Sequence, residues 1–190
     1  MSRIKAIIQS SIAVKEHILS NEDMINTIET ISELVVAAFN NGHRLYLCGN
    51  GGSAADAQHI AAELSGRFYI NRKALPAEAL HCNSSYLTAI ANDYSFEVIY
   101  SRLVEGILLP GDILMGFSTS GNSVNIIKAF ESARLKNITT IGFTGDTGGA
   151  LKALSDYLVN IPAKDTPRIQ ESHIMVGHII CELVEKKLFN

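Results

Sequence analysis

The sequence predicts an α/β fold, a three-layer sandwich in which a five-stranded parallel sheet lies between layers of helices, with additional helices at the N-terminus. Short apolar runs alternate with segments of helical periodicity, which is typical of a parallel sheet with helical crossovers. Glycine-rich or serine-rich loops follow three of these runs, as they do at the carboxyl ends of parallel strands. With 190 residues and 47% hydrophobic side chains, we expect residues 1–190 to form a single domain.

Two helices are expected ahead of the first strand. Residues 2–20 carry isoleucines at helical spacing, and a second periodic segment runs from Asn21 to Asn41-Gly42. Neither helix has a strand of its own to cover. We therefore expect residues 1–42 to pack in an oligomer, against another subunit.

Strands and helices are expected to alternate through the rest of the chain. The expected strands are 44–48, 76–81, 113–117, 139–144 and 157–161. The expected helices are 54–64, 84–92, 96–108, a segment around Ile126 to Ala133, a short one after Gly149, and a last helix opened by Pro167. Apolar residues from Ile174 to Leu188 fall at alternating three- and four-residue steps, which predicts a partner helix.

The loop Ser118-Thr119-Ser120-Gly121-Asn122-Ser123 joins the third strand to a helix and carries four hydroxyl side chains. A helix N-terminus presents unpaired backbone N–H groups, so this position suits a phosphate. We expect Gly121 to let the backbone approach the anion. The alternative is an ordinary turn in which one serine caps the helix, but a cap needs only one hydroxyl. No Gly-Lys-Ser/Thr follows, so the loop is not a Walker A motif, and a small phosphorylated metabolite fits better than a nucleotide.

A second loop, Gly49-Asn50-Gly51-Gly52-Ser53, follows the first strand and is expected at the same edge of the sheet. It resembles part of a dinucleotide fingerprint. However, the final spaced glycine is missing, and no acidic residue ends the second strand to hold a ribose. The sequence therefore disfavours nicotinamide binding.

Charge and cysteine usage limit the class of protein. The net charge is −3 and the pI about 6.1, which argues against a nucleic-acid or membrane-surface patch. No apolar run is long enough to cross a bilayer, and residues 1–20 do not resemble a signal peptide. The three cysteines are far apart and form no CxxC pattern. We expect a cytoplasmic protein with free thiols that binds neither nucleic acid nor membrane.

Two helical pairs of polar residues suggest a metal and acid–base site. His59 and Glu63 are four residues apart, hence on one helix face. Gln170 and His178 are eight residues apart, a net rotation of about 80°, so they can converge on one point two turns apart. Meeting at one point, they would suit zinc. If the two pairs do not meet, His59 and Glu63 form a surface interaction and His178 is an interface histidine. Spacing alone leaves both the metal site and this alternative open. We expect Glu171 and His173 to be solvent or interface residues, and His81, at the end of a predicted strand, receives no role.

The serine-rich loop resembles the phosphate loop of sugar isomerase (SIS) domains. The run from Gly49 to His59, then Glu63, Asn92-Asp93, the run from Thr166 to Glu171, and His178 together resemble the phosphoheptose isomerase family. The resemblance extends over nearly the whole chain, and several separate motifs occur in the same order.

This resemblance implies conversion of sedoheptulose 7-phosphate to D-glycero-D-manno-heptose 7-phosphate, the first step toward the heptose of bacterial lipopolysaccharide. It also implies a homotetramer with sites at subunit junctions, and one zinc per subunit. The zinc ligands would be His59, Glu63, Gln170 and His178. Glu63 is the candidate base and His178 the candidate acid, although the sequence leaves their division of labour open. The substrate-contacting residues would be Asn50, Gly51, Gly52, Ser53, Glu63, Asn92, Asp93, Ser118, Thr119, Ser120, Ser123 and Gln170.

Two other functions are considered. A non-enzymatic SIS tetramer that binds the bacterial replication initiator resembles this chain in the serine loop and in the Arg-Ile-Gln stretch, but lacks a histidine at the position of His178. Because His59, Glu63 and His178 are all present here, the enzyme is favoured. A phosphosugar-sensing regulatory domain is disfavoured, because no DNA-binding segment is attached.

Overall fold

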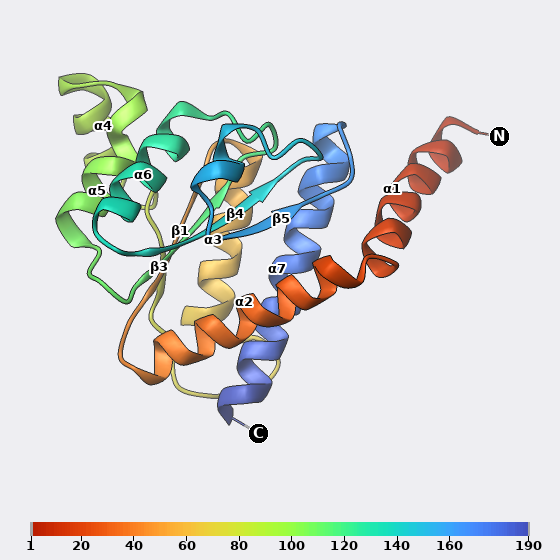
Figure 1. Cartoon of the computed structure of the whole chain (residues 1–190), viewed down its shortest axis with the longest axis horizontal. Helices are drawn as coiled ribbons and strands as arrows, with labels where there is room; N and C mark the ends of the chain where they lie inside the picture. Colours follow the sequence, from red (N-terminus) through yellow and green to blue (C-terminus); the bar gives the residue numbers. More distant parts are fainter. Residues whose placement is uncertain (1, 190) are drawn as a thin grey trace.

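A computed structural model describes residues 2–189 of the chain and contains one sheet of five parallel strands (Figure 1). The strand order is β2-β1-β3-β4-β5, and every neighbouring pair is parallel. The predicted fold class is therefore confirmed. The strands are β1 (Leu45–Gly49), β2 (Ala77–Ala79), β3 (Ile113–Phe117), β4 (Thr139–Thr144) and β5 (Tyr157–Asn160).

Helices cover both faces of the sheet and divide the core into two halves (Figure 1). Side chains of a strand alternate between its faces. Accordingly, Leu45 and Leu47 of β1 join one core, while Tyr46 and Cys48 join the other. The first core contains side chains of α2 (Glu22–Asn40), α3 (Gly52–Ser65) and α7 (Thr166–Phe189). The second contains side chains of α5 (Ile99–Ile107) and α6 (Val124–Leu135), with α4 (Ser84–Asp93) packed beside them.

The main differences from the prediction are in three elements and concern extent or helix type. The second strand is only three residues long, because the chain leaves the sheet edge after Ala79. The expected helix 96–108 begins with a 3-10 turn, Phe96–Val98, before α5. The short helix after Gly149 is a 3-10 helix, Ala150–Leu154.

The two N-terminal helices have different surroundings, and the expectation that neither has a part of the sheet to cover is wrong for α2; their packing against another subunit stays a prediction. Ile31 and Val35 of α2 are fully buried, and α2 packs on α7 and β5 of the same chain. By contrast, α1 (Arg3–Leu19) buries only Ile18 and extends beyond the rest of the fold (Figure 1). The order of elements concealed this difference, because a helix can cover a strand that comes much later in the chain.

The regular seam of α7 has its predicted partner helix within the same chain. Gly177 and Cys181 lie in the core shared with α3. A Cβ on Gly177 would come within 2.5 Å of Cδ1 of Ile60, so the small residue permits close packing of the two helices. This contact sets the distance between the faces of α3 and α7 that carry the candidate site.

Within residues 2–189, no helix combines the length and apolar character needed to cross a membrane. Cys48, Cys82 and Cys181 are all free thiols, as expected.

Candidate active site and metal centre

The candidate site begins where two neighbouring strands end and their helices diverge. Gly49 at the end of β1 lies opposite Phe117 at the end of β3. The helix after β1, α3, packs on one face of the sheet, whereas the helix after β3, α6, packs on the other. This is the topological switch point at which α/β sheets bind ligands, so the two predicted loops lie at one crevice.

The serine loop is held together by its own hydroxyl groups. Oγ of Ser118 lies 2.9 Å from Oγ of Ser123 and also accepts the backbone N–H of Ser123 at 3.4 Å. Oγ of Ser120 accepts the backbone N–H of Asn122. Ser118 is buried, whereas Ser120 is exposed and Thr119 and Ser123 are half-buried. The exposed and half-buried hydroxyls are those that can reach a ligand.

Gly121 has a structural role that was not predicted, and its predicted approach to an anion stays a prediction. Its φ is +66°, and a Cβ there would lie 2.1 Å from the carbonyl oxygen of Gly148. The loop after β4 thus packs directly on the serine loop, and the backbone N–H of Leu151 donates to the carbonyl of Gly121 at 2.9 Å. The glycine is required by this contact between loops, since any side chain would separate them.

A pair of asparagines joins the other loop to α6. Asn50 and Asn125 exchange two amide hydrogen bonds, at 2.8 and 2.9 Å, and Asn125 is buried. The hydroxyl of Tyr100 donates to the carbonyl of Gly49 at 2.5 Å and fixes the end of β1. Asn125 was not predicted, although an asparagine in the first helical turn after a predicted anion loop is a signal that could have been used.

The helices that start at the crevice lack side-chain caps. Ser2, Asn21 and Asn83 cap α1, α2 and α4 with side-chain oxygens. In contrast, neither Gly51 before α3 nor Ser123 before α6 makes a side-chain cap bond. Backbone carbonyls accept the first-turn N–H groups of Ser53, Ala54 and Ile126. The N–H groups of Gly52, Val124 and Asn125 make no hydrogen bond within residues 2–189 and can receive an anion.

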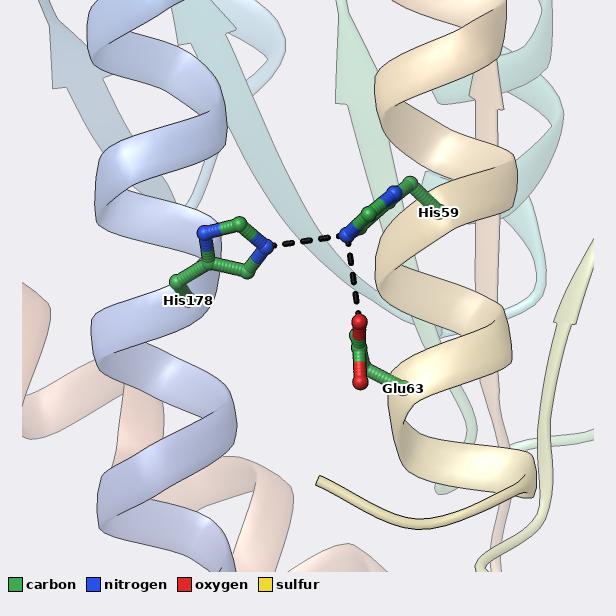
Figure 2. Close-up of side chains that lie close together, drawn as sticks. All are labelled: His59, Glu63 and His178. Carbon is green, nitrogen blue, oxygen red and sulfur yellow. Dashed lines mark hydrogen bonds and ion pairs between the residues drawn. The ribbon is translucent and has the colours of Figure 1, made fainter. Parts of the chain in front are cut away.

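His59, Glu63 and His178 converge further along α3 and α7, as predicted (Figure 2). Nε2 of His178 lies 3.0 Å from Nε2 of His59, which lies 3.1 Å from Oε1 of Glu63. Figure 2 shows the three side chains pointing into the space between the two helices. Gly52 and His59 are seven residues apart on α3, so this cluster lies about 10 Å along the helix from the crevice.

The donor set fits zinc. Two imidazoles and one carboxylate are the protein ligands of many catalytic zinc sites, which keep the fourth position open. Zn–N bonds of about 2.0–2.1 Å in a tetrahedron would put ligand atoms about 3.3 Å apart. The potential ligand atoms of the three residues all lie within 4.8 Å of one another. Small side-chain movements would therefore suffice to hold the ion.

Gln170, the fourth predicted ligand, does not lie with His59, Glu63 and His178. Its amide is beside Gly52 at the start of α3, where a Cβ would come within 2.6 Å of Nε2 of Gln170. His178 is eight residues further along α7, about 12 Å at 1.5 Å per residue. Within one chain, Gln170 therefore belongs with the crevice and its loops.

Asn92 and Asp93 are at the end of α4, and both are exposed. Asn92 donates to Asp93 at 2.9 Å. Among the hydrogen bonds of residues 2–189, none joins either side chain to the serine loop or to the histidine cluster. Their predicted role in substrate binding stays a prediction.

His173 contradicts the expectation of a solvent or interface residue. It is fully buried, its ring meets Phe117 and Phe143 edge-on, and its Nε2 lies 3.1 Å from the carbonyl oxygen of Thr144. Burial lowers the pKa of His173 to about 4, so the ring is neutral at pH 7. The residue ties α7 to the end of β4. Glu171 remains half-exposed and pairs with Arg168 at 2.6 Å.

Electrostatic surroundings shift other groups near α3. Burial lowers the pKa of His178, and the neighbouring His59 adds to this effect while Glu63 opposes it. Burial raises the pKa of Asp56, one turn before His59, to about 6. Burial also lowers the pKa of His81.

Comparison with known proteins adds independent evidence. The model of the SIS domain family matches residues 8–145. Phosphoheptose isomerases from Aneurinibacillus thermoaerophilus and Clostridium acetobutylicum are 52% and 54% identical over 186 residues, which cover 98% of this chain and 94% and 95% of those proteins. The structure of phosphoheptose isomerase GmhA from Neisseria gonorrhoeae superposes with a TM-score of 0.91 at 38% identity, covering 97% of both chains. The chain therefore belongs to the phosphoheptose isomerases of the SIS domain family.

Proposed function

We propose that this protein is an isomerase that converts sedoheptulose 7-phosphate to D-glycero-D-manno-heptose 7-phosphate. The observation that carries this proposal is the convergence of His59, Glu63 and His178, on two helices near the crevice at the ends of β1 and β3 where phosphate is expected to bind. The full-length similarity to phosphoheptose isomerases supports the same reaction. The initiator-binding alternative is not favoured, since the acid–base residues are present and close together.

The phosphate is expected to bind at the crevice. The exposed and half-buried hydroxyls of Ser120, Thr119 and Ser123 donate to its oxygens, together with the uncapped N–H groups of α6 and α3. These donors are uncharged. They fix the far end of an open-chain sugar and so reduce the orientational freedom of its reacting carbons. Asn50, Gly51, Gly52, Ser53 and Gln170 line the same edge and are expected to contact the sugar.

The reaction moves a carbonyl between C1 and C2 and requires one proton to be removed and returned. Glu63 is expected to take the proton from the carbon beside the carbonyl, and His178 to donate a proton to the oxygen as the enediol forms. The proton then returns to the neighbouring carbon. A zinc ion held by His59, Glu63 and His178 would stabilise negative charge on the substrate oxygens. A ligated carboxylate is a weaker base and a ligated imidazole a poorer acid, so for Glu63 and His178 the metal-binding role and the acid–base role are alternatives. Gln170 lies about 12 Å along α7 from His178, too far for its side chain to join these three ligands within one chain.

Replacement of the acid–base residues tests the proposal. We expect Glu63→Gln and His178→Ala each to lower the rate of heptose 7-phosphate formation by at least about 100-fold while the fold is retained. Glu182→Gln is the matched control, since Glu182 is on the same helix as His178 but pairs with Lys186 at 2.7 Å. A wild-type protein without isomerase activity, with or without added zinc, would refute the proposed reaction.

We also propose a homotetramer that acts in the cytoplasm, in the synthesis of lipopolysaccharide heptose. Exposed isoleucines on α1 support assembly, because a group of exposed apolar side chains on a helix that extends from the fold is typical of an interface. They are Ile4, Ile7, Ile8 and Ile12, which are 42–70% exposed. Light scattering should give four times the mass of 20.6 kDa, and Ile8→Lys should lower it. An unchanged mass in that variant would remove α1 from the interface.

A further inference from the structure

Arg72 and Glu185 form a buried ion pair outside the residues described above. Nε of Arg72 lies 3.0 Å from Oε2 of Glu185, and the side chains are 2% and 4% exposed. Removing two charges from water is costly, so such a pair is weak evidence for stability. Its hydrogen bonds indicate a positional role instead.

Each member of the pair holds a different part of the backbone. The Glu185 carboxylate accepts the N–H groups of Phe68, Tyr69 and Ile70 at 3.2, 2.7 and 3.0 Å. The Arg72 guanidinium donates to carbonyl oxygens at the end of α3, which have no partner within the helix. Its acceptors include the carbonyls of Glu63 at 2.9 Å, Leu64 at 2.7 Å and Gly66 at 3.0 Å. The pair thus fastens the end of α3 and the segment after it to α7.

The fastened segment carries Phe68, which contacts the candidate acid. The rings of Phe68 and His178 are stacked, with centroids 5.8 Å apart and an angle of 29° between their planes. His59 meets the same imidazole edge-on, with centroids 5.0 Å apart. Because the terminal torsion of histidine is broad, a ring without such neighbours would rotate. Phe68 therefore restricts the orientation in which Nε2 of His178 faces α3.

We propose that the Arg72–Glu185 pair is a brace that holds Phe68 against His178, and that these three residues position the acid–base and metal-binding cluster. Phe68, Arg72 and Glu185 are positioning residues, since they act through His178 and Glu63. The inference rests on the proposed function for its kinetic consequence, but the orientation of the ring does not depend on turnover.

Variants of Phe68 test the contact with His178. We expect Phe68→Ala to lower kcat and the affinity for Zn²⁺ by about 10-fold or more, because the loss of a residue that orients a metal ligand usually has an effect of this size. KM should change little, because the serine loop is not touched. Phe68→Tyr keeps the ring and should restore both values. Ile70→Ala is the control, an apolar truncation in the same segment. If Phe68→Ala behaves like Ile70→Ala in kcat and Zn²⁺ affinity, the contact has no positioning role.

Variants of the pair test the brace itself. Glu185→Gln should accelerate hydrogen exchange at the amides of residues 68–70 and shift the ring resonances of His178, in metal-free protein as well. Arg72→Lys keeps the positive charge but loses the several hydrogen bonds from the guanidinium to backbone carbonyls. It replaces Glu185→Gln in this test if that variant does not fold. Faster exchange with unchanged His178 resonances would overturn the brace. If the wild type proves not to isomerise the sugar, the proposed reaction fails, whereas exchange, ring resonances and Zn²⁺ affinity still decide this inference.

Discussion

Substituting Gly121 by alanine should destabilise the protein more than the same change at Gly42 or Gly106. Two costs combine at this position. A left-handed φ of +66° costs a residue with a Cβ about 1–2 kcal/mol. The new methyl would also lie 2.1 Å from the carbonyl oxygen of Gly148, and such overpacking typically costs about 1–3 kcal/mol. We therefore expect Gly121→Ala to lower the free energy of unfolding by about 2–5 kcal/mol.

Two other glycines separate these costs. Gly42 has a φ of +78° but nothing within 4 Å of its Cβ position, so Gly42→Ala should show only the backbone cost of about 1–2 kcal/mol. Gly106 is helical with open space around it, and Gly106→Ala should stabilise by up to about 1 kcal/mol.

The assay is urea unfolding of all three variants at one protein concentration, because assembly makes apparent stability depend on concentration. Without urea, the folded Gly121→Ala variant should also show a raised KM for sedoheptulose 7-phosphate, because the methyl group pushes the two loops apart. Equal unfolding free energies for Gly121→Ala and Gly42→Ala would refute the loop-against-loop reasoning.

Three further predictions concern single side chains. Asn125→Ala should cost about 1–3 kcal/mol of stability and raise KM, because it leaves the amide of Asn50 without its buried partner; an unchanged urea midpoint would contradict this. Ser120→Ala should raise KM with kcat unchanged, because one exposed phosphate donor is lost; steady-state kinetics that match the wild type would count against the phosphate site. His173 has a native pKa of about 4, below its ordinary value of 6.5, so the unfolded chain takes up the proton first. Its contribution is complete above about pH 6.5 and is lost as the pH falls toward 4, by at most about 3 kcal/mol. Unfolding free energies measured across this range should fall less steeply for His173→Phe than for the wild type.

Much of the candidate site could be predicted from local patterns. The serine loop lies between an apolar strand and an amphipathic helix, so its position at the carboxyl edge of the sheet follows from the alternation of elements. The spacing of His59 and Glu63 places them on one helix face for the same reason. These predictions succeed because strand and helix geometry relates residues that are only a few positions apart.

Other residues could not be recognised in this way. Helical spacing alone could not place Gln170 beside Gly52 or bury His173 against Phe117 and Phe143. Nor did any motif point to Phe68 as the neighbour of His178.

The sequence by itself determined the alternation of strands and helices, the two loops at the sheet edge, and the residue types able to hold a phosphate and a metal. Only the tertiary structure decided that α2 covers the sheet while α1 does not, and that α3 and α7 approach closely enough for His59 to meet His178. The physical reason is that periodicity reports which face of an element is apolar, but not which other face it packs against. That choice depends on side-chain packing between segments more than a hundred residues apart, such as Ile60 against Gly177.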